Sequence, residues 1–501
     1  MAVEMQLRRV RARQQRNRAT CVACGVRKGE NVSTVPNPSP SRGRAHIVLI
    51  PGFAGFDPLG QIEYYAGTTD SYQRWRNAGG SPDRDVVLHY FDNLPTAGVQ
   101  TRAERLRGYL AKRIARGEIQ DGDTIALVGH STGGLDIRRM LSAPAPDPLP
   151  LDGGGATDRS KATVVNVHQS EILDRVSRVV FVSVPQFGTN IADWVRGHTL
   201  LRRSVIEGLY RGVQGAVIPP LEKAISGLLA DLGKLAKQPD LIKAAQDALS
   251  ETIASRVDPW QRANAQEAAS QLRLWLRHAA DDFAAIDDLA SFTKPPLNSR
   301  SPAHYSDDER QAECFQWRHN GIRTMSIATI GRRAFTFDPG KPAEPFDFLK
   351  ESTWPTNEQA SDADQMDISY LCAYRACAGG WFEVPPSLAT VCRDIATLNT
   401  SLFDLTKLGP HGPKPGEGLA VWDNDGIVNT ASMLWPNRED TLLVAADHLD
   451  IVGHYVARKT VPSPDASGRH YASYDGLKSH TSFTQDEFDH VWNGIFDFCV
   501  R

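Results

Sequence analysis

Long apolar runs are absent from this 501-residue sequence, and so is a marked excess of either charge. A membrane-spanning helix needs about 18 consecutive apolar residues, and because no run approaches that length we expect no such helix. Lysine and arginine number 56 against 59 aspartate and glutamate, which gives no reason to expect a nucleic-acid partner. The seven cysteines are scattered and odd in number, which is unlike a disulfide framework.

The start of the chain lacks the apolar segment of a secretory signal. Residues 8 to 18 are almost free of apolar side chains and contain Arg8, Arg9, Arg11, Arg13, Arg16 and Arg18. Since no apolar segment follows these arginines, we expect residues 1–43 to be a basic, disordered leader and the protein to be cytoplasmic, with export left open. An arm that binds nucleic acid or an anionic surface is the alternative. Cys21 and Cys24 are interpreted as incidental, because no second pair of metal ligands lies nearby.

One stretch in the first third of the chain carries a catalytic pattern. The apolar run Thr124 to Val128 predicts a buried strand, Gly129-His130-Ser131-Thr132-Gly133 follows it, and Leu135 to Leu141 predicts a helix. A Gly-x-Ser-x-Gly between a strand and a helix is the nucleophile elbow typical of α/β-hydrolases. Its two glycines stand where larger side chains would collide with neighbouring backbone. We therefore interpret Ser131 as a nucleophile; a glycine-rich turn without function is the alternative.

The elements around this stretch alternate between strand and helix. This alternation predicts a mostly parallel, doubly wound sheet and the α/β-hydrolase fold. The domains expected are residues 44–190 for the first part of the core, 191–300 for a helical cap or lid, and 301–501 for the rest of the core, with a loop-rich insertion over 335–415. An ordinary accessory layer is the alternative for the helical part. The strands expected are His46–Ile50, Val86–Tyr90, Thr124–Val128, Arg178–Val182, Met325–Ile330 and Thr441–Ala445, and the helices outside the cap are Ser71–Asn77, Thr101–Arg116 and Gln485–Phe496.

A serine nucleophile needs a histidine base and an acid that orients it, and in this fold the acid precedes the histidine along the chain. His448 follows a predicted strand directly and is the preferred base, because no strand precedes His454 or His480. Asp425 is the preferred acid over Asp423, although turn formation alone would explain either aspartate. The neighbour of the nucleophile, His130, points away from the serine in this geometry and is given a structural role.

The oxyanion hole of this fold combines a glycine-rich turn after an early strand with the residue after the nucleophile. The turn Pro51 to Phe56 meets the first condition, so the backbone N–H groups of Phe53 and Thr132 are the donors we expect. Two fixed N–H groups stabilise a developing oxyanion without reorganisation. A plain turn is the alternative for Pro51 to Phe56. Residues Ser183 to Thr189 are expected to line the mouth of the site.

The late motifs make the sequence resemble a known family. Asn424 to Thr430 with Ser432-Met433, followed by Asp447 to Asp450, resembles the true bacterial lipases of the Bacillus, Staphylococcus and Pseudomonas types. The resemblance implies the triad Ser131, Asp425 and His448, with Phe53 and Thr132 at the oxyanion. It departs from the family at Pro51 and at Gln186, where a histidine is usual. Those lipases often hold a structural calcium; Asp450 stands at one ligand position, but Tyr455 replaces a second carboxylate, so no cofactor or metal is expected.

The function expected is that of a serine ester hydrolase, a lipase or carboxylesterase that forms an acyl-enzyme on acyl ester or lipid substrates. The alternatives on the same fold are a polyester (polyhydroxyalkanoate) depolymerase, a thioesterase and an acyltransferase. A hydrolase fold used only for binding is a further alternative, which the complete set of serine, aspartate and histidine disfavours.

Overall fold

The computed structural model describes the core of the chain. The described residues are 43–53, 55, 64–81, 83–143, 167–197, 284–292, 295–297, 299–333, 368–379, 408, 412, 419–436, 441–455, 458–462, 470–473, 475, 477 and 479–501. Residues 1–42 of the expected leader and 198–283 of the expected cap lie outside this set, so both stay predictions.

Six parallel strands form the central sheet, in the order β2-β1-β3-β4-β5-β6. The chain therefore leaves β1 for a neighbour on one side and then returns to a neighbour on the other side. Such a switch point, at the carboxyl ends of β1 and β3, is where open α/β sheets bind ligands. The bounds are β1 Ala45–Ile50, β2 Val86–Tyr90, β3 Thr124–His130, β4 Val176–Val182, β5 Arg323–Ile330 and β6 Thr441–Ala445.

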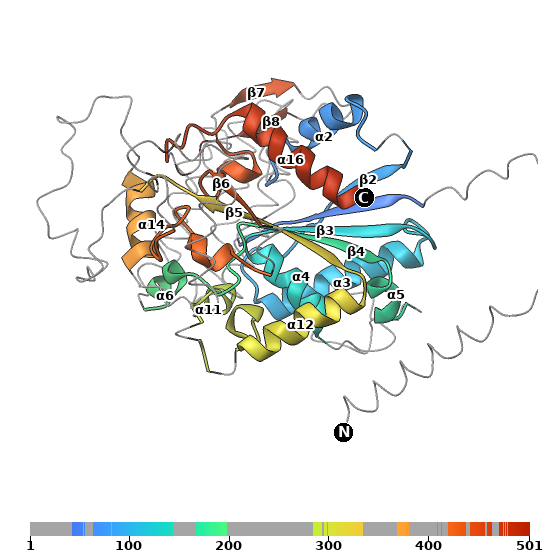
Figure 1. Cartoon of the computed structure of the whole chain (residues 1–501), viewed down its shortest axis with the longest axis horizontal. Helices are drawn as coiled ribbons and strands as arrows, with labels where there is room; N and C mark the ends of the chain where they lie inside the picture. The colour runs from blue at the N-terminus through green and yellow to red at the C-terminus, as the bar shows by residue number, and fades with distance from the viewer. Residues whose placement is uncertain are drawn as a thin grey trace, which may run out of the picture. The chain divides into compact units, whose positions relative to one another are not determined.

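Helices cover both faces of this sheet (Figure 1). One face packs against α3 (Val99–Ala115), α4 (Thr132–Ser142) and α12 (Asp307–His319), and the other packs against α2 (Thr68–Asn77) and α16 (Gln485–Val500). Alternate strand residues point to opposite faces, so Ile125 and Leu127 join the first core while Ala126 and Val128 join the second. This doubly wound architecture confirms the predicted fold class.

The remaining described elements are short, apart from the helix α14. They are α5 (Gln169–Leu173), α6 (Asn190–Gly197), α11 (Ala285–Asp288), α14 (Ile368–Gly379), the 3₁₀ turns η2 (Pro302–His304), η4 (Thr430–Met433) and η5 (Asp450–Val452), and an antiparallel pair, β7 (Arg458–Pro462) with β8 (His470–Ser473). Loops and short elements were predicted over 335–415, and this was wrong for the 12-residue helix α14. Its apolar residues are not confined to one side of the helix, so the sequence shows no amphipathic pattern there. The helix α12 was also missed, although Ser306 and Glu309 form a capping box at its start.

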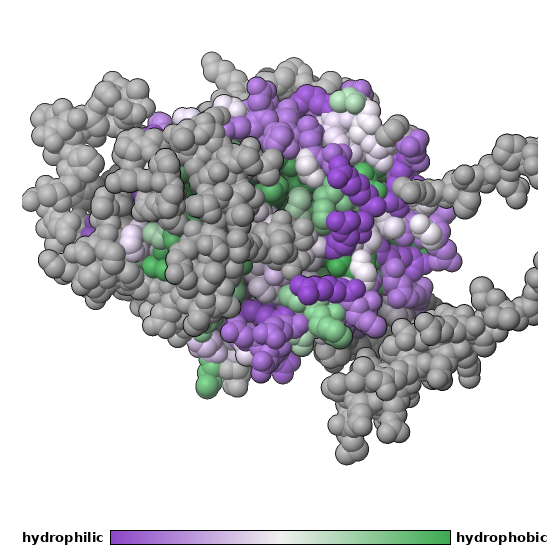
Figure 2. Space-filling view, viewed as in Figure 1, coloured by the Kyte–Doolittle hydropathy of each residue, from purple (hydrophilic) through white to green (hydrophobic). Residues whose placement is uncertain are grey.

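On the face drawn in Figure 2, hydrophilic residues cover much of the described surface, with hydrophobic residues between them. The large apolar side chains that are strongly exposed among the described residues are Leu297 and Phe315. No helix in the part of the chain that the structure describes is long and apolar enough to cross a membrane.

Candidate active site

Ser131 stands at the sharp turn between β3 and α4. Its backbone has φ 53° and ψ −129°, a conformation that costs a residue with a side chain on the order of 1–3 kcal/mol. The glycines on either side are required, as the sequence predicted: a Cβ on Gly129 would lie 2.7 Å from the backbone of Gly133, and one on Gly133 would lie 2.4 Å from the carbonyl oxygen of Ile50. The chain thus holds the strained geometry of a nucleophile elbow at this serine.

His448 and Asp425 are brought together by the loops after β6 and before η4. Nδ1 of His448 lies 2.8 Å from Oδ2 of Asp425, and the backbone N–H of His448 donates to the Asp425 carbonyl at 3.0 Å. The carboxylate also accepts hydrogen bonds from Thr329 Oγ1 at 2.6 Å and from the N–H groups of Ile427 and Val428. Because Nδ1 faces the carboxylate, Nε2 is the ring nitrogen left for proton transfer.

The alternatives to this pair have other partners. Asp423 forms a double hydrogen bond with Arg333, at 2.7 and 2.9 Å, and also accepts from the N–H of Ala420. His454 Nε2 bonds the carbonyl of Tyr64, and His480 is exposed. Of the acids and bases considered from the sequence, the structure joins Asp425 and His448.

The loop after β1 is held by a buried arginine that the sequence analysis missed. Nη2 of Arg102 donates to the carbonyl oxygens of Pro51 and Gly52 at 2.7 and 3.1 Å, and the same guanidinium pairs with the buried Asp136. In a trans peptide the C=O and the N–H point in opposite directions, so fixing the Gly52 carbonyl also fixes the direction of the Phe53 N–H. Arg102 stands four residues before Leu106 and eight before Leu110, two core residues of α3, and therefore lies on the buried face of that helix. A charged residue on a buried helix face is the sequence feature that could have indicated its role.

The second expected donor, Thr132, is the first residue of α4. The N–H groups of a first helical turn have no acceptor within the helix, so this one can donate to a group outside it. The Oγ1 of Thr132 is buried without a hydrogen-bond partner in the structure. A helix N-terminus also carries a partial positive charge that favours an anion.

The loop after β4 contacts the turn that carries Asp425. Gln186 is fully buried and accepts a hydrogen bond from Arg138 at 3.0 Å. Thr189 donates to the carbonyl of Ile427, and Ser432 donates to the carbonyl of Gly188. The loop thereby braces the turn that carries Asp425, and a role of residues 183–189 at the mouth of the site stays a prediction.

The chain resembles bacterial lipases and carboxylesterases in structure. No family model matches the chain, and no curated protein matches it in sequence. A metagenomic carboxyl esterase is 12% identical with a TM-score of 0.32, over 95% of this chain and 81% of its own. The Staphylococcus hyicus lipase is 12% identical with a TM-score of 0.38, over 93% and 97%. A Bacillus licheniformis lipase is 11% identical with a TM-score of 0.30, over 83% and 90%. The sequence identities and TM-scores are low. The evidence for the fold is therefore the strand order and the sharp turn at Ser131.

Three carboxylates converge beside the loop of His448. Oxygen atoms of Asp447, Asp450 and Asp475 lie within 4.8 Å of one another. This all-oxygen set fits a hard cation such as Ca²⁺. Tyr455 stands where the lipases often have a second carboxylate, and here Asp475 supplies a further carboxylate to the cluster. A cation bound there would brace the histidine loop. Asp447 accepts a hydrogen bond from Ser479 Oγ and Asp450 accepts one from Thr481 Oγ1, both at 2.6 Å. The absence of a cofactor therefore stays a prediction.

This cluster makes stability depend on pH. Burial raises the pKa of Asp447 to about 7, whereas an aspartate in an unfolded chain titrates near ~3.9. The folded state then binds the proton more tightly, so the contribution to the free energy of unfolding is present below about pH 4 and is lost as the pH rises through about 7. Between about pH 5 and pH 8, in chelator, wild type is expected to lose on the order of 2 kcal/mol relative to Asp447→Asn. Urea unfolding of both proteins measures this, and parallel curves against pH would contradict it.

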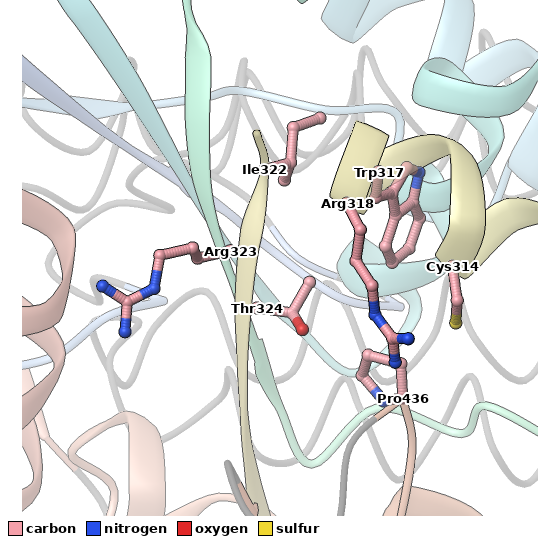
Figure 3. A pocket seen from close by; sticks show the side chains of 7 residues that line it. All are labelled: Cys314, Trp317, Arg318, Ile322, Arg323, Thr324 and Pro436. Atoms are coloured by element: carbon pink, nitrogen blue, oxygen red, sulfur yellow. The ribbon is translucent and has the colours of Figure 1, made fainter. Parts of the chain in front are cut away.

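A small cavity of about 120 Å³ lies elsewhere, between the C-terminal end of α12 and the start of β5. Its lining residues are Cys314, Trp317, Arg318, Ile322, Arg323, Thr324 and Pro436. Figure 3 shows Thr324 and Arg323 pointing to opposite sides of the strand, so the Arg323 guanidinium points away from the indole of Trp317. The cavity borders the amino end of β5, whereas the candidate active site lies at the carboxyl ends of the strands.

Proposed function

We propose that the protein is a serine ester hydrolase of the lipase and carboxylesterase type. The observation that carries the proposal is the buried His448–Asp425 hydrogen bond beside an elbow that holds Ser131 at a positive φ. The ring of His448 lies with its centroid 4.6 Å from that of His130, the residue next to the nucleophile. A base oriented by an acid beside a strained serine is the arrangement that acyl transfer to serine needs.

The reaction proceeds in two halves. Ser131 Oγ attacks the ester carbonyl carbon while Nε2 of His448 takes its proton, and the N–H groups of Phe53 and Thr132 stabilise the oxyanion. His448 then gives the proton to the leaving alcohol, and the C–O bond of the ester breaks to leave an acyl-serine. Water loses a proton to His448 and attacks this acyl group, and Ser131 recovers its proton as the acid departs. Asp425 stabilises the imidazolium in both halves. No step passes through the carboxylate cluster.

Hydrolysis of p-nitrophenyl esters from acetate to palmitate, with and without EDTA, tests the proposal. We expect turnover of at least part of the series in both buffers, since no chemical step requires a metal; a lower rate in EDTA would indicate that a cation at the carboxylate cluster stabilises the loop of His448. Adding an alcohol together with water separates a hydrolase from an acyltransferase by the product formed. A protein that turns over no ester and does not react with a fluorophosphonate would contradict the proposal.

A further inference from the structure

Three hydrogen bonds in series join the loop after β1, the residue before the nucleophile, and the loop of His448. The backbone N–H of Gly52 lies 2.9 Å from Tyr64 Oη, which lies 2.6 Å from Nδ1 of His130. The other ring nitrogen of His130, Nε2, lies 3.0 Å from the carbonyl oxygen of His448. The mechanism above uses neither Tyr64 nor His130.

The direction of each bond follows from the groups involved. The Gly52 N–H can only donate, so Tyr64 Oη accepts from it and donates its own hydrogen to His130 Nδ1. The His448 carbonyl can only accept, so the single ring N–H of the neutral His130 lies on Nε2. His130 is therefore a single neutral tautomer with both nitrogens satisfied. Its full burial lowers its pKa well below the usual value, and burial raises the pKa of Tyr64, so neither group ionises near neutral pH.

These bonds reach every part of the proposed machinery. Gly52 precedes the oxyanion donor Phe53, and a Cβ added to Gly52 would lie 2.6 Å from Cβ of Ser131 and 2.7 Å from Tyr64 Oη. Gly52 thus lies close to both the nucleophile and the tyrosine. His448 is tied from two sides, through its carbonyl to His130 and through its N–H to Asp425. A rigid connection of this kind fixes the separation between the oxyanion donors and the base.

We propose that Tyr64 and His130 are positioning residues, which hold the loop of Phe53 and the loop of His448 in register with Ser131. The inference rests on the proposed function. Removing the Tyr64 hydroxyl leaves two buried polar groups, the Gly52 N–H and His130 Nδ1, without their partner. The loops then relax, and a displacement of about 1 Å at a reacting group costs up to about 100-fold in rate. Substrate affinity is little affected, because neither residue binds the substrate.

Tyr64→Phe is expected to lower kcat per active site by about 10- to 100-fold while KM changes by less than about threefold. Active sites are counted by titration with a fluorophosphonate, so misfolded molecules do not enter the rate. Tyr72→Phe is the control: the hydroxyl of this buried tyrosine of α2 donates a hydrogen bond to the carbonyl of Val86 at 2.8 Å. We expect its kcat to stay within about twofold of wild type, since the change also removes a tyrosine hydroxyl from a hydrogen bond but at the amino end of β2, far from the site.

Substitutions of His130 separate the two ends of the connection. In His130→Asn the amide stands near the place of Nδ1 and retains an acceptor for Tyr64, but the donor to His448 is lost. In His130→Gln the amide stands near the place of Nε2 and retains that donor, but Tyr64 loses its acceptor. Both are expected to lower kcat. Adding Tyr64→Phe to His130→Gln should have clearly less than the additive effect, because both changes break the Tyr64–His130 bond and only the bond to Gly52 remains to be lost.

An unchanged kcat per titrated site in Tyr64→Phe, with an active wild type, would overturn this inference and leave the proposed function standing. Additive effects in the double variant would do the same. Should Tyr64→Phe not fold, His130→Asn decides: a kcat within about twofold of wild type rejects the positioning role. A wild type that neither reacts with the fluorophosphonate nor hydrolyses esters overturns the proposed function itself.

Discussion

Ser131→Ala is expected to lower kcat for p-nitrophenyl esters by about 10³- to 10⁶-fold, the largest effect of any single change. The variant keeps the oxyanion donors and the base but has no atom that can form the acyl-enzyme. Its residual rate then comes from water alone in a site that still binds and polarises the ester. Measurement requires the initial rate on the best ester of the series and a circular dichroism melt of the same sample.

The fold is expected to survive this change, because alanine adopts the backbone of residue 131 at no greater cost than serine. Ser142→Ala is the matched control, since Ser142 ends the same helix, α4, and its hydroxyl bonds Glu313. Its kcat should stay within about threefold of wild type. A Ser131→Ala protein with undiminished turnover would remove the nucleophile from the account.

Asp425→Asn is expected to lower kcat by about 10³- to 10⁴-fold. The asparagine amide has one acceptor oxygen where the carboxylate has two, and three donors besides His448 already point at this group. If the oxygen stays with the backbone N–H groups, the NH₂ faces His448 Nδ1 and favours the wrong tautomer of the imidazole. The loss should fall on kcat with a small effect on KM, because the aspartate does not bind substrate.

Asp423→Asn is the comparison that makes this prediction specific. It weakens the buried ion pair with Arg333 and should therefore lower the free energy of unfolding, by about 1–3 kcal/mol. Its kcat per titrated active site should fall by less than about tenfold. The reverse ranking of the two variants, with the larger loss of kcat at position 423, would transfer the role of the acid to Asp423.

The parts of the site that sequence could predict are those with a local signature. Gly129 and Gly133 flank the nucleophile for steric reasons that act over a few residues, and the strands around them have short apolar runs. His448 follows a strand in the place that the fold requires. These local features predict the fold class, the elbow and the candidate base.

The parts that sequence could not predict depend on distant partners. Asp425 is the preferred acid and the one that the family resemblance implies, but its turn chemistry equals that of Asp423; the contacts that separate them are Arg333 on Asp423 and His448 on Asp425. Tyr64 resembles any aromatic residue until its hydroxyl meets Gly52 and His130. Asp475 joins the carboxylate cluster from 25 residues beyond Asp450, a distance at which no ligand spacing is visible. Long-range pairing of polar groups therefore marks the limit of the prediction.

The most direct test of the central claim, that Ser131 attacks the acyl carbon, is to locate the residue that forms a covalent adduct. Wild type is incubated with a fluorophosphonate, digested, and mapped by mass spectrometry. We predict one adduct, on the peptide that contains Ser131, formed more slowly in Asp425→Asn and absent in Ser131→Ala. An adduct on another residue, or rapid ester turnover by a protein that forms no adduct, would contradict the account.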